Sequence, residues 1–408
     1  MNSKDVICPY PWTHFSTHTD GRMRICCNTS TSGDILDSDG NPIYIDEIKN
    51  IKDYFNQDFY KNIRKQMLNG DRPNICSACY SIEDKNGTSV RNGVLQSFEV
   101  EKFTDNTDLE TGEIINLSVE SLDLSWSNKC NLQCKMCGPW ASNQLETEYN
   151  DLYKFFEPLD NNKWSYKNLK ITLDKISATV TELLVTGGEP LLNNDFLEFC
   201  DYLHNNDLSK NIIFTFHTNL TIMPKKFFDR LSKFKMVRMH ISIDAVGDLY
   251  EYVRYPGKWS VVDRNFRKLI ELIENHPTYE VEIHTVFQTY GIHGFVDILK
   301  YFNQFSHIEN FRTIPYFIWP YSPSHSCTSI LRKKHKQKLK NQILKHADKM
   351  KNDRNTYLYN QLIACINLME TTKPKMEIEQ FKAHVEKQDN YRKQDTKKYL
   401  PWLYLDKQ

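Results

Sequence analysis

The fold is decided by residues 120–137, which read ESLDLSWSNKCNLQCKMC. Leu122, Leu124 and Trp126 alternate with polar residues, a pattern typical of a β-strand whose two faces differ. The first of three cysteines follows this strand after three residues. Barrel enzymes place their active sites where a strand ends, so this stretch indicates both a barrel strand and a site.

Strands and helices alternate outward from this stretch, from about residue 119 to residue 320. Helical patterns such as 193–206 and 261–275 fill the gaps between short apolar or alternating runs. Regular alternation predicts parallel βαβ units, and six units in about 200 residues favour a partial barrel over a closed eightfold one. We expect the strands at 120–126, 182–186, 212–217, 237–243, 280–287 and 311–318.

Several of the expected strands carry polar residues on one face. If helices cover the apolar face, the polar face lines an interior cavity, which suits a polar ligand. An antiparallel sheet with one wet face is the alternative, and a purely structural role is the alternative for each histidine. The side chains that we expect to hold a substrate are Thr215, His217, His240, Glu282, His284 and Gln288.

Composition narrows the class of protein. The 408 residues carry 52 basic and 52 acidic side chains, so no overall field attracts the chain to nucleic acid or to a membrane. No run of eighteen apolar residues occurs, and the N-terminal residues lack the pattern of a signal peptide. We therefore expect a cytoplasmic protein. In that compartment clustered cysteines indicate metal binding or catalysis rather than disulfides.

The cysteines at 130, 134 and 137 form a set with distinct chemistry. Thiolates are the ligands of iron–sulfur clusters, and three of them leave one iron of a cubane open to another ligand. The alternative is that this spacing marks the buried face of a helix. The polar residues between the cysteines and the Gly138-Pro139 pair make a poor amphipathic helix.

The spacing of Cys130, Cys134 and Cys137 after a first strand resembles the signature of the radical S-adenosylmethionine (SAM) superfamily. The resemblance implies a [4Fe-4S] cluster on these cysteines and bound SAM. Gly187, Gly188, Glu189 and Pro190 resemble the family's motif that contacts the methionine amino group. By the same resemblance, Asn219 and Ser242 are candidates for ribose or carboxylate contacts of SAM, and Arg254 for its carboxylate.

A second group of cysteines precedes the barrel. Cys8, Cys76, Cys79 and one of Cys26 and Cys27 could ligate a complete cubane, and four thiolates would also suit zinc. The group resembles the auxiliary-cluster domains called twitch or SPASM, and so does the tail around Asp389-Asn390-Tyr391-Arg392. We favour an auxiliary iron–sulfur cluster, of the [4Fe-4S] type, with Cys26 as the ligand. The remaining cysteines, which we expect to be buried and apolar in character, are Cys200, Cys327 and Cys365.

The predicted fold is α/β, a partial (β/α)6 TIM-like barrel with attachments. We expect an auxiliary-cluster domain at 1–100, a linker at 101–118, the barrel at 119–324 and a helical C-terminal extension at 325–408.

The resemblance implies an oxidoreductase-type enzyme that cleaves SAM reductively to a 5′-deoxyadenosyl radical. This radical would abstract hydrogen from a small metabolite or a peptide, for net oxidation or crosslinking. A reductase or flavodoxin-type protein would supply the electron. The alternative is a non-catalytic zinc or iron–sulfur protein, either an electron carrier or a module that binds nucleic acid through the basic stretch 332–345.

Overall fold

The computed structural model describes residues 6–29, 33–84, 89–96, 98–154, 167, 170, 179–317, 324–347, 356–374 and 376–405. The chain forms two compact units. The first comprises Met1–Asn128, Leu159–Phe216 and Lys226–Met236, and the second comprises Lys129–Pro158, His217–Lys225 and Val237–Gln408. Each unit is described by itself below.

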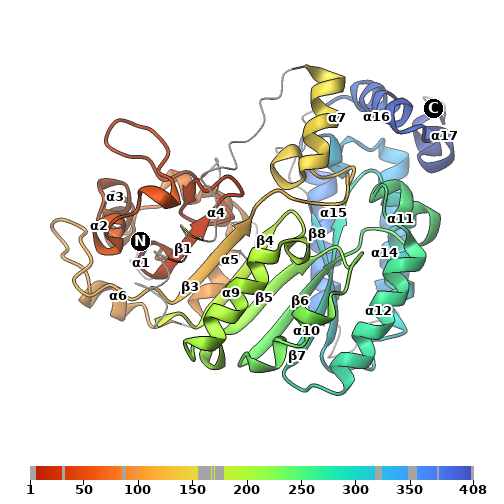
Figure 1. The fold of residues 1–408 in the computed structure, drawn as a ribbon. Helices are drawn as coiled ribbons and strands as arrows, with labels where there is room; N and C mark the ends of the chain where they lie inside the picture. The colour runs from red at the N-terminus through yellow and green to blue at the C-terminus, as the bar shows by residue number, and fades with distance from the viewer. Residues whose placement is uncertain are drawn as a thin grey trace. The chain divides into compact units, whose positions relative to one another are not determined.

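The sheet of the first unit has the strand order β2-β1-β3-β4-β5 (Figure 1). Its strands are β1 (His14–Thr17), β2 (Met23–Arg24), β3 (Ser121–Trp126), β4 (Glu182–Gly187) and β5 (Ile213–Thr218). Only the β1–β2 pair is antiparallel, and β1–β3, β3–β4 and β4–β5 are parallel. Every residue of β3 is buried, as expected of a strand with a neighbour on each side.

The second unit contains β6 (Met236–Ser242), β7 (Tyr279–Phe287) and β8 (Phe311–Phe317), which pair in parallel. Its register places His240 beside Glu282 and Ser242 beside His284. Buried and half-buried residues alternate along β6 and β7, and most of the polar residues are in the half-buried set. The polar face predicted for these strands is therefore present.

The six strands expected from the sequence all form, each within two residues of its predicted bounds. The helices expected between them include α9 (Asn194–Asn205) and α12 (Trp259–Glu274). Parallel pairing rules out the antiparallel alternative, and the α/β, partial TIM-like fold class is confirmed. Strands β1 and β2 were not predicted. They extend the sheet from the region in which we expected the auxiliary-cluster domain.

Helices cover the strands through apolar stripes. In α12 the buried side chains Val262, Phe266, Leu269, Ile270 and Ile273 recur at helical spacing. Burial of each such side chain contributes about 1.5–3 kcal/mol. Phe266 packs edge-to-face on Phe302 of α13 (Phe295–Asn303). Cys200, Cys327 and Cys365 are buried, as predicted for cysteines without a metal role.

The N-terminal part of the first unit contains several short helices. Its helices are α1 (Tyr10–Thr13), α2 (Ile51–Phe55), α3 (Asp58–Leu68), α4 (Ser77–Glu83), α5 (Val90–Leu95) and α6 (Glu101–Asp105). The fully buried Arg64 of α3 donates hydrogen bonds to the carbonyl oxygens of Gly112, Pro11 and Phe55. The segment 101–118, expected as a linker, thus carries a helix and packs against α3.

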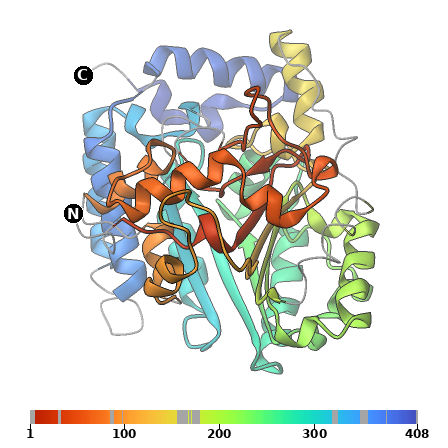
Figure 2. The same ribbon diagram turned by 90° about the vertical axis from the view of Figure 1, so that its left-hand side faces the viewer.

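The C-terminal part of the second unit is helical, as predicted. It contains α14 (Lys333–Ala347), α15 (Thr356–Thr371), α16 (Ile378–Arg392) and α17 (Thr396–Tyr399). Figures 1 and 2 both show α16 beside α7 (Asn143–Tyr153). Arg392 of α16 forms a buried ion pair with Glu148 of α7, at 2.7 Å. Among the described residues, no helix is both long enough and apolar enough to cross a membrane.

Candidate active site

The three cysteines at 130, 134 and 137 lie on a loop, not on a helix. The backbone N–H groups of Gln133 and Lys135 donate to the carbonyl oxygens of Tyr255 and Val253, at 2.6 and 2.8 Å. The side chain of Asn143, in the first turn of α7, accepts a hydrogen bond from the N–H of Cys130, at 3.0 Å. The helix-face alternative is therefore excluded, and the loop is fixed through its backbone.

Nitrogen donors approach the sulfurs of this loop. The Asn219 side-chain amide lies 3.9 Å from Cys130 Sγ, and one guanidinium nitrogen of Arg254 lies 3.8 Å from Cys134 Sγ. Burial raises the pKa of the Cys137 thiol, and the sulfurs of Cys134 and Cys130 raise it further. Three sulfurs that repel one another as thiolates, with cationic and amide donors beside them, fit a positively charged iron cluster.

Arg254 contacts both Asp244 and Cys134. It is buried, and its Nε donates to Asp244 Oδ2 at 2.6 Å, while another nitrogen reaches the Cys134 sulfur. Asp244 Oδ1 in turn accepts the backbone N–H of Val286 at 2.6 Å. These contacts link the cysteine loop to the end of β6 and to β7. Arg254 thus contacts a predicted cluster ligand, and its contact with the SAM carboxylate stays a prediction.

Asn219 directly follows β5, and Ser242 is the last residue of the neighbouring strand β6. The Asn219 amide donates to Asn131 Oδ1 at 3.0 Å, and its oxygen accepts the N–H of Thr221 at 2.9 Å. Asn219 is thus held beside the cysteine loop. Ser242 is half-buried at the last position of β6.

The Gly187-Gly188-Glu189-Pro190 segment belongs to the first unit. Gly187 ends β4 with φ of 118°, and a Cβ there would meet the Ser127 carbonyl oxygen at 2.6 Å. Only glycine fits this backbone without strain. The N–H of Gly188 donates to the same oxygen at 2.8 Å. Glu189 is fully buried, and its carboxylate accepts the N–H of Leu191 at 3.2 Å. The segment is a rigid turn at a strand end.

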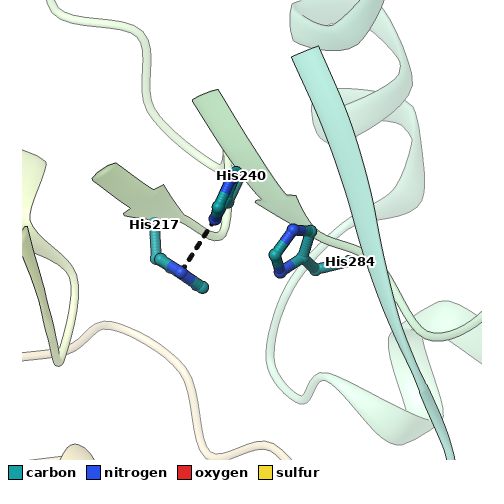
Figure 3. A group of neighbouring side chains, drawn as sticks. All are labelled: His217, His240 and His284. Carbon is teal, nitrogen blue, oxygen red and sulfur yellow. Dashed lines mark hydrogen bonds between the residues drawn. The ribbon is translucent and has the colours of Figure 1, made fainter. Parts of the chain in front are cut away.

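Three of the substrate candidates, His217, His240 and His284, come together in one cluster (Figure 3), whereas Thr215 and Gln288 are not part of it. His240 Nδ1 lies 3.0 Å from His217 Nε2, and the His240 and His284 rings stack with centroids 3.9 Å apart. Glu282 Oε2 lies 3.2 Å from Nε2 of both His240 and His284. Burial lowers the pKa of His284 to about 4, so this imidazole is neutral near pH 7.

The family model of the radical SAM superfamily matches residues 124–301, which contain the cysteine loop and most of the strands described above. Residues 124–301 thus form a radical SAM domain. The family implies a [4Fe-4S] cluster and SAM as cofactors.

The curated relatives of this radical SAM protein include GTP 3′,8-cyclases. The chain is 27% identical to that of Alkaliphilus oremlandii over 161 residues, 39% of this chain and 46% of the relative. It is 27% identical to the probable GTP 3′,8-cyclase of Methanococcus aeolicus over 192 residues, 46% and 57% of the two chains. The chain spans about half the length of the curated relatives it matches.

Solved radical SAM structures are also similar. Streptococcus suis SuiB bound to S-adenosylmethionine matches 72% of this chain and 64% of its own, with 15% identity and a TM-score of 0.39. The anSMEcpe structure with bound AdoMet and the Cp18Cys peptide matches 55% and 58%, with 18% identity and a TM-score of 0.36.

The cysteines that precede the radical SAM barrel lie close enough to interact. Burial raises the pKa of the Cys8 thiol, and the sulfurs of Cys76 and Cys79 contribute to the rise. Burial likewise raises the pKa of the Cys26 thiol, and the sulfurs of Cys27, Cys8 and Cys76 raise this pKa further. Asn28 donates a hydrogen bond to Cys79 Sγ at 3.2 Å.

Cys27 differs from Cys26 in its surroundings. The Cys27 residue as a whole is exposed, whereas its thiol is enclosed. Burial raises the pKa of this thiol to about 12, Asp123 adds to the rise and Arg24 opposes it. Among the described residues, the three histidines at 217, 240 and 284 form the group of possible ligand atoms lying within 4.8 Å of one another. The sulfurs of four cysteines that bind a single zinc ion would also lie this close to one another. The sulfurs that ligate a cubane bind different irons, so they lie farther apart.

Some residues that hold the radical SAM cysteine loop were missed in the sequence. Lys135, inside the loop, pairs with Asp389 of α16, and both side chains are buried. The signal was partly visible, because the Asp389–Arg392 segment stood out as a family-like tail. The partner of Asp389 could not be inferred, since 254 residues separate it from Lys135.

A cavity of about 270 Å³ lies elsewhere in the second unit, among α13, β8 and α15. None of the cysteines, SAM candidates or clustered histidines lines it.

Proposed function

We propose that this chain binds a [4Fe-4S] cluster through Cys130, Cys134 and Cys137 and cleaves SAM reductively at it. When bound, the cluster would supply one electron to SAM, and the resulting 5′-deoxyadenosyl radical would abstract hydrogen from the substrate. The observation that carries the proposal is the cysteine loop itself. Three buried or half-buried sulfurs follow β3 inside the matched family region.

The protein's own residues would tune and position this cluster. N–H donors to a thiolate stabilise its charge, so the Asn219 amide and the Arg254 guanidinium would favour the deprotonated, ligating sulfurs. Asp244 keeps the guanidinium aimed at Cys134. We assign Gly187, Gly188, Glu189, Pro190, Asn219, Ser242 and Arg254 to SAM binding on the family resemblance.

We also propose an auxiliary [4Fe-4S] cluster on Cys8, Cys26, Cys76 and Cys79. The hydrogen bond from Asn28, directly after Cys26-Cys27 in the sequence, to Cys79 Sγ supports a shared site, and the exposure of the Cys27 residue supports Cys26 as the ligand. A fully ligated second cluster could accept the electron that a substrate radical must lose on oxidation. This supports net oxidation or crosslinking of a small metabolite or a peptide, with a flavodoxin-type reductase as electron donor.

A second candidate reaction is a radical cyclisation of a nucleotide. The names of the relatives favour it, since they are GTP 3′,8-cyclases. Incubation with GTP separates the two candidates. A new nucleotide product would identify the cyclisation, and unchanged GTP beside turnover of SAM would favour oxidation or crosslinking of another substrate.

The test of the proposed function is SAM cleavage by the full chain. The protein is reconstituted without oxygen with iron and sulfide, then mixed with SAM and dithionite, and 5′-deoxyadenosine is measured by mass spectrometry. Formation of 5′-deoxyadenosine supports the proposal. A full complement of iron without this product would replace it with the electron-carrier alternative, and stoichiometric zinc in place of iron would favour the structural-metal alternative.

A further inference from the structure

The cluster of His217, His240, His284 and Glu282 has the composition of a metal site that neither iron–sulfur cluster explains. The three imidazoles come from three strands, and their ligand atoms all lie within 4.8 Å of one another (Figure 3). The side chains of His240, Glu282 and His284 are 16%, 14% and 11% exposed. A site this enclosed holds its ligands in place before any metal arrives.

One of the nitrogen–nitrogen distances is close to the distance that a tetrahedral cation requires. With Zn–N bonds of about 2.0–2.1 Å, two nitrogens on one zinc lie about 3.3 Å apart. His240 Nδ1 and His217 Nε2 are 3.0 Å apart, so the pair needs to open by only a few tenths of an ångström. The other ligand atoms lie within 4.8 Å of one another, so side-chain rotations would have to bring them closer by up to about 1.5 Å.

Glu282 sits where an outer carboxylate sits in many zinc sites. Its Oε2 accepts from Nε2 of His240 and of His284, which places the proton on Nε2 and the lone pair on Nδ1 in both rings. The strand register explains this arrangement, because Glu282 is directly opposite His240 on β7 and His284 lies two residues further along the same face. Arg312 of β8 approaches the other Glu282 oxygen, at 3.9 Å, and offsets part of its charge.

We propose that His217, His240 and His284 bind one Zn²⁺ ion, with Glu282 as the carboxylate behind two of the imidazoles. Three imidazoles leave one tetrahedral position open, as in catalytic zinc sites. That position takes an oxygen of the substrate, a carboxylate, phosphate or hydroxyl group, and holds it by Lewis-acid attraction. The binding of substrate oxygen rests on the proposed function, whereas the binding of Zn²⁺ does not.

The test measures zinc on the reconstituted full chain. After addition of one equivalent of ZnSO4 and desalting, metal content is determined by mass spectrometry and the ligand shell by X-ray absorption at the zinc edge. We expect about one zinc per chain in a nitrogen and oxygen shell at about 2.0–2.1 Å. Absence of zinc, or a sulfur shell at about 2.3 Å, would overturn the proposal, since it would place the metal on cysteines.

Variants locate the metal on these residues. His240→Ala should lose the zinc, and Glu282→Gln should keep the fold while weakening zinc affinity by about 10–100-fold, as loss of an outer carboxylate does. The exposed His307 provides a matched control, and His307→Ala should bind zinc as the wild type does. Unchanged zinc affinity in both His240→Ala and Glu282→Gln would contradict the site.

The same preparations are assayed for 5′-deoxyadenosine, so that the two proposals fail separately. Nitrogen-bound zinc without SAM cleavage would leave the metal site standing and remove the proposed function. SAM cleavage without nitrogen-bound zinc would remove the metal site and leave the proposed function standing.

Discussion

Lys135, between two of the cluster cysteines, forms a buried ion pair with Asp389 near the end of α16. Asp389 also accepts hydrogen bonds from the hydroxyl groups of Tyr252 and Thr396, at 3.0 and 2.6 Å. The Lys135 ammonium lies over the Tyr252 ring, 4.6 Å from its centroid. The C-terminal helix therefore fixes the conformation of the cysteine loop. A buried carboxylate with this many donors is well satisfied, and its loss leaves a buried charge without a partner.

Asp389→Asn tests this anchor. Because the variant leaves the Lys135 charge buried and unpaired, we expect the free energy of unfolding to fall by about 3 kcal/mol. We also expect the cluster to be lost more rapidly in air. Urea unfolding and the decay of the cluster's visible absorption measure the two effects. The exposed Asp297, which pairs with Lys300 on α13, gives the control: Asp297→Asn should cost less than about 0.5 kcal/mol. Equal costs for the two variants would contradict the anchor.

Gly187→Ala tests the rigid turn after β4. The added Cβ would meet the Ser127 carbonyl oxygen at a backbone φ of 118°, so we expect a loss of at least about 2 kcal/mol in unfolding free energy, together with weaker SAM binding. Gly93, in α5, is the matched control, since nothing lies within 4 Å of its Cβ position. Gly93→Ala should be neutral or stabilise by about 0.5–1 kcal/mol. Chemical denaturation and titration with SAM compare the two variants.

Separate substitutions of the adjacent residues Cys26 and Cys27 test which of them is a ligand of the auxiliary cluster. Cys26→Ser should reduce the iron of the reconstituted protein from about eight to about four atoms per chain, because the auxiliary cubane loses a ligand. Cys27→Ser should keep about eight. Iron and acid-labile sulfide are measured on both proteins. The reverse pattern would assign Cys27 as the ligand, and four irons in the wild type would remove the auxiliary [4Fe-4S] cluster.

His14 couples stability to pH in the first unit. It is buried on β1 with Nδ1 3.0 Å from Ser121 Oγ, and burial lowers its pKa from 6.5 to about 4. As the pH falls below 6.5 the unfolded chain binds a proton that the native state excludes, so stability is lost with decreasing pH. Between about pH 7 and pH 5 this contribution is about 2 kcal/mol. Urea unfolding of His14→Gln should show a pH dependence smaller by this amount than the wild type, and His307→Gln should not.

The sequence predicted features whose signals are local. Strands such as β6 and β7 were readable because polar and apolar residues alternate within each one, and turn residues bound them. The cysteine loop and the glycine turn after β4 were readable from short local motifs, the spacing of the three cysteines and the run Gly187-Gly188-Glu189-Pro190. The clustering of His217, His240 and His284 followed in part from parity, since each lies on the polar face of its strand.

Features that depend on distant pairing were not predicted. Strand β1 is only four residues long and wholly buried, so it shows no alternation, and its partner β3 lies more than a hundred residues away. The register that sets Glu282 beside His240 is likewise a property of two paired strands. The pairing of Lys135 with Asp389 depends on how α16 returns to the cysteine loop, which no local pattern in either segment encodes.

The most direct test of the account compares Cys130→Ala with Cys200→Ala, a buried cysteine on α9 with no assigned metal role. Both proteins are reconstituted anaerobically and assayed for iron and for 5′-deoxyadenosine from SAM and dithionite. We expect Cys130→Ala to lose about four irons and all 5′-deoxyadenosine, while Cys200→Ala retains both. Formation of 5′-deoxyadenosine by Cys130→Ala at the wild-type rate would contradict the assignment of the SAM-cleaving cluster to this loop.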